Sequence, residues 1–222
     1  MGICALGNIF QTKVDKLLGD IDGVKKYIDD IPVLGKDTFE NNTDKMRIIL
    51  GRLRAAGLKA NSPKCSFGLK EIPYLGYVIT REGIKPDPNK VQGIMYLVRS
   101  ATTTEAQVII CMVQYYRDMW PRQSQILAPL TEAASSPKCR KILWDYALEI
   151  SFKEIKRMVC AETLLNDLHW KLLFIVNTYA PDKQVGAVII HNNKPIDFFS
   201  RILSTPQGNY NTTKKELLAI VE

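Results

Sequence analysis

Residues 24–34 read Val-Lys-Lys-Tyr-Ile-Asp-Asp-Ile-Pro-Val-Leu and place two adjacent carboxylates, Asp29 and Asp30, between two short apolar runs. Apolar runs of this length on either side of turn residues predict a β-hairpin with an acidic tip. Pro32 is unfavourable in the second run, because proline has no N–H to donate to a ladder. Asp-Asp is common turn material, so the pair alone indicates little. An aromatic residue two positions earlier, Tyr27, makes the pattern much more specific.

Two adjacent carboxylates at a tight turn form a candidate site for hard divalent cations. Mg²⁺ is typically bound by one or two protein carboxylates, with waters and substrate phosphates completing its coordination shell. A pair of such ions can activate a hydroxyl nucleophile and stabilise a leaving pyrophosphate. Asp29 and Asp30 are therefore candidate metal ligands and catalytic residues for nucleotidyl transfer.

Hydrophobic periodicity predicts an α+β chain around this hairpin. Apolar residues recur at helical spacing in segments 9–21, 46–56, 88–98, 102–119, 128–134, 144–159 and 212–222. A second hairpin is expected over 71–80, and three further strands over 172–178, 185–191 and 195–200, with Asn192-Asn193 as a tight turn. Asp87 and Thr102 are predicted helix N-caps, and Thr213 with Glu216 a capping box.

Composition narrows the class of protein. The 222 residues are 46% hydrophobic and 24% charged, which excludes a wholly disordered chain. No apolar run reaches the length of a membrane helix, so we expect no membrane partner. The 5 cysteines are odd in number and scattered, which fits neither a disulfide framework nor a zinc site, and we expect an intracellular location, cytoplasmic or nuclear. The net charge of +7 favours a phosphate-bearing partner.

Several motifs occur in a fixed order along nearly the whole chain. They are Met1-Gly2-Ile3-Cys4 with Phe10-Gln11, Tyr27-Ile28-Asp29-Asp30, 53–59 with 61 and 64–67, Tyr74-Leu75-Gly76-Tyr77, 83–91, Tyr115-Tyr116-Arg117, 128–131, 186–188, 199–201 and 209–221. In this order they resemble the reverse transcriptase of gypsy-type LTR retrotransposon Pol polyproteins, followed by the start of its RNase H-like domain.

The resemblance implies three modules. They are the C-terminal part of a palm (1–85), thumb or connection helices (86–165), and the N-terminal part of an RNase H-like domain (166–222), a truncated β-β-β-α unit.

The resemblance also implies RNA-directed DNA synthesis with ribonuclease H activity, and Mg²⁺ held by Asp29 and Asp30. The implied partners are an RNA/DNA primer–template duplex, a dNTP and other parts of a Pol polyprotein, and the implied setting includes a virus-like particle. The implied nucleic-acid contacts are Gln11, Tyr27, Tyr74, Leu75, Gly76 and Tyr77.

The sequence departs from the family pattern at both sites. The palm's further Asp and the fingers would lie upstream of Met1. In the RNase H-like part, Tyr179 stands where the family has Asp within T-D-A-S. Glu216 matches the family's helix carboxylate, although the capping role competes with a catalytic one. We therefore expect the chain alone to be inactive or nearly so.

Two alternatives remain open. The chain could be a non-catalytic remnant that binds a primer–template duplex, with an affinity that falls with salt. It could also be a decayed open reading frame.

Overall fold

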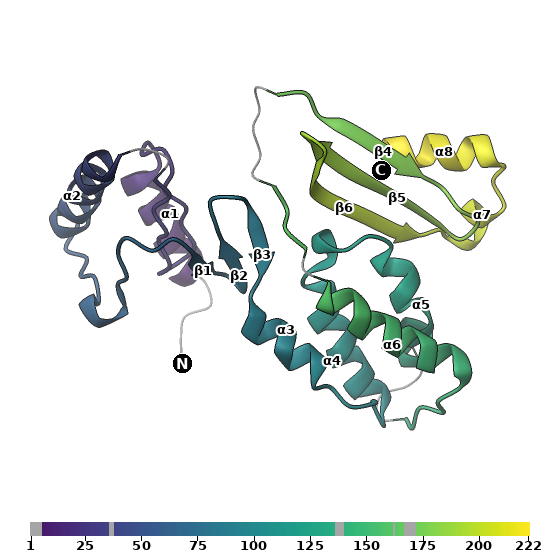
Figure 1. The fold of residues 1–222 in the computed structure, drawn as a ribbon. Coiled ribbons are helices and arrows are strands. Elements are labelled where there is room, and N and C mark those ends of the chain that lie inside the picture. Colours follow the sequence, from purple (N-terminus) through teal and green to yellow (C-terminus); the bar gives the residue numbers. More distant parts are fainter. Residues whose placement is uncertain (1–5, 36–37, 136–139, 162, 167–171) are drawn as a thin grey trace. The chain divides into compact units, whose positions relative to one another are not determined.

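The computed structural model describes residues 6–35, 38–135, 140–161, 163–166 and 172–222 (Figure 1). The Met1-Gly2-Ile3-Cys4 motif lies outside these residues. The chain divides into two compact units, Met1–Tyr74 and Leu75–Glu222. Each unit contains its own hydrophobic cluster or clusters, and each is described by itself below.

The first unit contains two packed helices, α1 (Leu6–Leu18) and α2 (Phe39–Ala55), followed by the short 3-10 helix η1 (Ser62–Lys64) and strand β1 (Ile72–Tyr74). Its small core is made of Val14, Leu18, Val24 and Ile49. Outside this core, Arg52 of α2 donates to the carboxylate of Asp20, with one bond of 2.8 Å, and ties α2 to the end of α1.

The chain reverses direction over 24–34 as the predicted hairpin requires, but the two predicted strands do not form. Only two isolated bridges form, between Val24 and Val33 and between Tyr27 and Asp30. Pro32 gives the physical reason. Its carbonyl accepts from the Lys25 N–H at 3.1 Å, but it has no N–H with which to return a bond, so the ladder is interrupted.

The second unit begins with an antiparallel pair, β2 (Tyr77–Ile79) and β3 (Ile84–Pro86). Five helices follow: α3 (Pro88–Met95), α4 (Thr103–Gln114), η2 (Arg117–Met119), α5 (Gln123–Ala134) and α6 (Tyr146–Cys160). The predicted N-caps Asp87 and Thr102 are confirmed, because their side chains accept from the N–H groups of Asn89 and Glu105.

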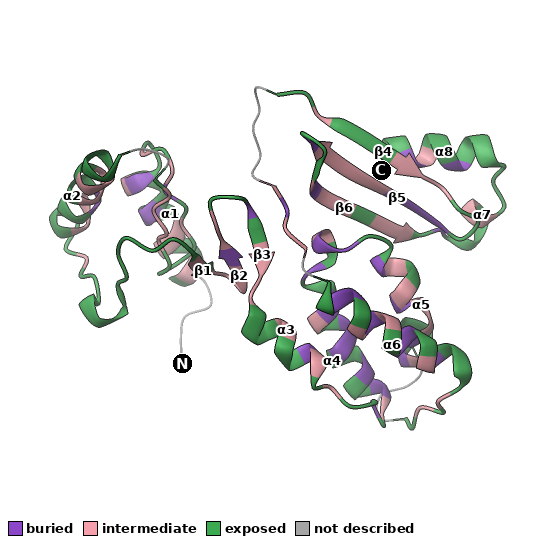
Figure 2. Cartoon of the chain, in the orientation of Figure 1, coloured by how far each residue is buried: buried purple, intermediate pink, exposed green. Residues whose placement is uncertain are grey.

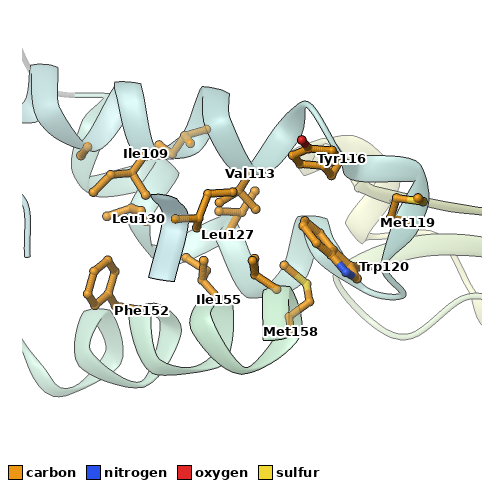
Figure 3. Packing of buried hydrophobic residues seen from close by; sticks show 14 of the residues in the cluster. Ile109, Val113, Tyr116, Met119, Trp120, Leu127, Leu130, Phe152, Ile155 and Met158 are labelled. Carbon is orange, nitrogen blue, oxygen red and sulfur yellow. The ribbon is translucent and has the colours of Figure 1, made fainter. Parts of the chain in front are cut away.

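The main core lies among α4, α5 and α6 (Figure 3). Phe152, Ile155 and Met158 of α6 face side chains from α4 and α5, and Trp120 closes one end. In Figure 2 the buried residues lie on the facing sides of these helices. Burial of apolar area at roughly 25 cal/mol per Å² makes this cluster the main source of stability in the unit.

Helix α5 is longer than the sequence predicted, because it starts at Gln123 and contains Pro129 in its interior. Proline in a helix removes one backbone hydrogen bond. Tertiary packing offsets that loss. Leu127 and Leu130 are buried in the core, and the amide Nε2 of Gln123 donates to the carbonyl of Val113 at 2.9 Å.

The C-terminal part is a meander of three antiparallel strands, β4 (Ile175–Tyr179), β5 (Gln184–His191) and β6 (Lys194–Ile202), followed by α7 (Thr205–Gly208) and α8 (Thr212–Val221). The predicted turn at Asn192-Asn193 is confirmed, because both residues have positive φ, as a type I′ turn requires. The predicted capping box of α8 is wrong. Asn211 caps the helix by accepting from the Lys214 N–H at 3.0 Å.

The sheet packs on the helices within this unit. Phe198 of β6 lies against the helical core, and the Ser124 N–H at the start of α5 donates to the hydroxyl of Ser200 at 3.0 Å. Within the part of the chain that the structure describes, no helix has both the length and the apolar character needed to cross a membrane.

Candidate functional site

The two candidate carboxylates lie on a two-residue turn. The Tyr27 N–H donates to the Asp30 carbonyl at 3.0 Å, and the Asp30 N–H donates to the Tyr27 carbonyl at 2.9 Å, which leaves Ile28 and Asp29 as the loop. Ile28 has φ +53°. A β-branched residue in this region is a conformational outlier, because its Cβ crowds the backbone. Asp29 is not in the positive-φ region, so the pattern of φ values is that of a type II′ turn, in which glycine usually takes the first position.

The side chain of Gln11, on α1, fixes this turn. Its Oε1 accepts from the Ile28 N–H at 2.6 Å, and its Nε2 donates to the Lys26 carbonyl at 3.3 Å. The same Nε2 donates to both carboxylate oxygens of Asp15, each at 3.2 Å. Asp15 also pairs with the Lys26 ammonium at 3.6 Å. If the amide O and N were exchanged, the amide oxygen would face three acceptor oxygens and could bond to none of them. The neighbours of Gln11 therefore set the orientation of its amide.

Both carboxylates point to solvent. Asp29 and Asp30 are exposed, and Tyr27 is 51% exposed. No ion pair joins either carboxylate to another of the described residues, so their oxygens are available to a ligand. Two adjacent hard oxygen donors fit a divalent cation that completes its shell with water and phosphate. Among the described residues, no His, Cys, Asp or Glu cluster of three surrounds a possible metal position.

Tyr74, at the end of β1, lies in the same neighbourhood. Burial raises the pKa of its hydroxyl, and the negative charge of Asp30 raises it further. Tyr74 therefore stays a neutral hydrogen-bond donor at neutral pH. The structure thus brings Gln11, Tyr27, Asp30 and Tyr74 together in the first unit, as the sequence motifs grouped them.

The remaining predicted nucleic-acid contacts lie in the second unit. Leu75 and Gly76 have φ +47° and +71° and form a turn that leads into Tyr77. The hydroxyls of Tyr115 and Tyr116 hold the carbonyls of this turn. From the sequence, these two tyrosines are recognisable only as part of a motif shared with the family.

In the C-terminal sheet, Tyr179 pairs with Gly186 of the neighbouring strand. The tyrosine ring covers Gly186 so closely that a Cβ there would overlap the ring. Burial raises the pKa of the Tyr179 hydroxyl. Glu216 is exposed on α8. The strand position at which the resemblance implies a carboxylate thus holds a packed aromatic ring.

Comparison with known proteins identifies the class of this fold. Residues 144–222 match the model of the RNase H-like domain found in reverse transcriptase. Two solved structures of foamy viral protease-reverse transcriptase share the fold at 22% sequence identity. The complex with dsDNA has a TM-score of 0.90 over 100% of this chain and 47% of that chain. The complex with RNA/DNA hybrid has a TM-score of 0.88 over 97% of this chain and 30% of that chain.

The curated relatives are retrotransposon Pol polyproteins, which confirms the relationship expected from the motifs. The chain is 31% identical to the retrovirus-related Pol polyprotein from transposon opus of Drosophila melanogaster, over 96% of the chain and 23% of that protein. It is 27% identical to the polyprotein from transposon gypsy, over 99% of the chain and 22% of that protein. The chain is thus a reverse transcriptase and RNase H-like segment of retrotransposon Pol type, and it spans about a fifth of these relatives' length.

Proposed function

We propose that this chain is part of an RNA-directed DNA polymerase that adds a nucleotide from a dNTP to the 3′ end of a primer. The observation that carries the proposal is the turn at Tyr27–Asp30. It presents two exposed carboxylates on a conformationally strained loop whose backbone is hydrogen-bonded to Gln11. Strained loops held by their surroundings are typical of functional sites, and rigid placement of charge is the main requirement of phosphoryl and nucleotidyl transfer.

In this proposal Asp29 and Asp30 hold Mg²⁺. When bound, the divalent ions would supply charge stabilisation at the triphosphate and the attacking hydroxyl. The chain's own contribution is to orient the carboxylates. Gln11 and the Tyr27–Asp30 backbone pair fix the turn, and the exposed ring of Tyr27 lies two residues before the first carboxylate, where it can contact the primer end.

The proposed partner is a primer–template duplex. The support is the fold shared with reverse transcriptases that were solved with dsDNA and RNA/DNA hybrid, together with the net charge of +7. The proposed contacts are Gln11, Tyr27, Tyr74, Leu75, Gly76 and Tyr77. Contacts of the chain's Lys and Arg side chains with the phosphates of the duplex would make the logarithm of affinity fall linearly with the logarithm of salt concentration.

We further propose that the chain acts with other segments of a Pol polyprotein, inside the cell, in the cytoplasm, the nucleus or a virus-like particle. Among the described residues, no third His, Cys, Asp or Glu joins Asp29 and Asp30 in a metal-binding group. A site with two carboxylates supports ion binding more readily than turnover, so the isolated chain should extend a primer poorly or not at all.

A metal-binding experiment tests the carboxylate pair without requiring turnover. In NMR spectra of the full chain, millimolar Mn²⁺ should broaden the amide signals of residues 27–30 selectively, because a bound paramagnetic ion relaxes nearby nuclei. The D29N/D30N double variant should lose this broadening, while D44N, at an exposed helical carboxylate, should keep it. Broadening that is equal in the wild type and in D29N/D30N contradicts the proposed site. Robust primer extension by the isolated chain would contradict the need for other segments.

A second candidate function concerns the RNase H-like module. The ring of Tyr179 over Gly186 favours a module that supports nucleic-acid binding without hydrolysis, because a carboxylate is absent from that strand position. The measurement is cleavage of the RNA strand of an RNA/DNA hybrid by the full chain. Cleavage that depends on Glu216 would contradict this assignment.

A further inference from the structure

The turn at Leu75-Gly76 is held by three tyrosines of the second unit. Tyr115 Oη donates to the Leu75 carbonyl at 2.7 Å, and Tyr116 Oη donates to the Gly76 carbonyl at 2.7 Å. Tyr77 Oη donates in the opposite direction, to the Tyr115 carbonyl at 3.0 Å. Three hydroxyls thus engage three carbonyls, between a turn and a helix end that are about forty residues apart in sequence.

The aromatic rings support the same arrangement. The ring centroids of Tyr115 and Tyr116 are 5.0 Å apart and nearly perpendicular, and that of Tyr77 lies 5.2 Å from Tyr116. Such edge-to-face pairs are favourable beyond their buried area. A Cβ at Gly76 would lie 3.2 Å from the ring of Tyr115 and 3.3 Å from the Tyr116 hydroxyl. The turn therefore fits closely under the two rings. A side chain at 76 would push these rings back by a few tenths of an ångström, and the positive φ also favours glycine.

The hydrogen bonds also orient the charge of the turn. The Gly76 carbonyl accepts a second bond, from the Asp87 N–H at 3.0 Å, so both of its acceptor sites have protein donors. The Leu75 carbonyl is taken by Tyr115. The negative ends of both peptide groups are thereby turned toward the protein. An anionic backbone that approaches the turn does not meet free carbonyl oxygens, whose repulsion would oppose binding.

We propose that Tyr115 and Tyr116 are positioning residues that hold the Leu75-Gly76 turn in the conformation that binds the primer–template duplex. The proposal rests on the proposed function, which assigns this turn to the duplex. The hydroxyls act on the turn rather than on the nucleic acid, because both are already donated to protein carbonyls. Hydroxyl removal should therefore lower duplex affinity without changing the number of phosphate contacts.

The test uses the full chain with Tyr115→Phe, Tyr116→Phe and the double variant, which keep the rings and remove the hydroxyls. The matched control is Tyr96→Phe, because Tyr96 is 76% exposed and is the C-cap residue of α3, at the opposite end of that helix from Asp87. The first readout is hydrogen exchange of the Asp87 amide, whose acceptor is the Gly76 carbonyl. The second is binding of a fluorescent RNA/DNA hybrid, measured by anisotropy at several salt concentrations.

We expect Asp87 exchange to accelerate about fivefold for each hydroxyl removed, which corresponds to the usual net contribution of one hydrogen bond. Duplex affinity should fall by a similar factor, with an unchanged slope against log salt. The control should change neither. Unchanged Asp87 exchange in the double variant overturns the hydrogen-bonded arrangement. Faster exchange with unchanged duplex affinity overturns the positioning role. A wild-type chain that binds no hybrid at low salt overturns the proposal through the proposed function, and this outcome is separate because it appears before any substitution.

Discussion

Replacing Gln11 by leucine should release the turn that carries Asp29 and Asp30. The substitution keeps side-chain volume on α1 but removes the acceptor for the Ile28 N–H and the donor to the Lys26 carbonyl. Each such bond contributes about 0.5–1.5 kcal/mol net. The two bonds together thus contribute about 1–3 kcal/mol, with the lower end applying to the exposed Ile28 amide.

The strain at Ile28 opposes these bonds. A non-glycine residue in the left-handed region costs about 1–2 kcal/mol. The two magnitudes are similar, so the turn should lose its preference for one conformation once Gln11 no longer holds it. We expect the free energy of unfolding of the first unit to fall by about 1–2 kcal/mol, and the Asp30 amide, which is bonded across the turn to Tyr27, to exchange faster.

Hydrogen exchange followed by NMR measures the effect at Ile28 and Asp30 directly. Gln92→Leu is the matched control, because Gln92 is an exposed helical glutamine outside this site. Gln11→Glu separates the two bonds. It keeps an acceptor for Ile28 but places a carboxylate against Asp15, so its effect should exceed that of leucine at neutral pH and diminish in acid as one carboxyl is protonated. Exchange rates at Ile28 and Asp30 that are equal in wild type and Gln11→Leu refute the reasoning.

Further predictions concern strain, charge and packing. Ile28→Gly should stabilise the turn by relieving the positive φ, seen as slower Asp30 exchange, and faster exchange would contradict this. The hydrogen bond from Arg52 lowers the pKa of Asp20 to about 2. This pair therefore stabilises the fold above the ordinary carboxyl pKa and loses its effect as the pH falls toward 2. In a carboxyl NMR titration, Arg52→Gln should return Asp20 to an ordinary value. Burial raises the pKa of Tyr116 to about 12. The stabilisation that the neutral Tyr116 hydroxyl gives the fold is therefore complete below the pKa of an unfolded tyrosine, and it is lost as the pH rises to about 12. The pKa of Tyr77 is likewise raised to about 12, so tyrosinate absorbance should show one fewer late-titrating tyrosine in Tyr116→Phe. Leu130→Ala should cost about 2–5 kcal/mol in urea unfolding because it opens a cavity in the core, whereas Leu143→Ala, at a side chain 89% exposed, should change little.

Periodicity and capping predicted most of the secondary structure. Asp87 and Thr102 begin helices as expected, and Asn192-Asn193 forms the expected turn, because each depends on local backbone chemistry. The errors arose where tertiary packing outweighed a local rule. α5 runs through Pro129 because Leu127 and its neighbours are buried, and Asn211 caps α8 where Thr213 was expected.

The position of the candidate site could be predicted from the sequence, but the hydrogen bonds that hold it could not. The motif identified Asp29 and Asp30, and their role stays a prediction. The bond from Ile28 to Gln11 joins residues 17 positions apart, and the bonds from Tyr115 and Tyr116 span 40 positions. Contacts at such separations depend on how helices pack, which periodicity does not specify. In the sequence, Tyr115 and Tyr116 are recognisable only as part of a family motif, which does not indicate what their hydroxyls contact.

The packing of Tyr179 over Gly186 has a consequence for the order in which substitutions could occur. Placing an acidic residue at 179 would leave a ring-sized void above the glycine and a carboxylate at a position that burial makes unfavourable. Filling that void first, by a larger residue at 186, is blocked by the ring itself. Neither single step is neutral, so the two positions can change only together. A carboxylate at 179 therefore needs a larger residue at 186 in the same variant if the packing of this strand pair is to be kept.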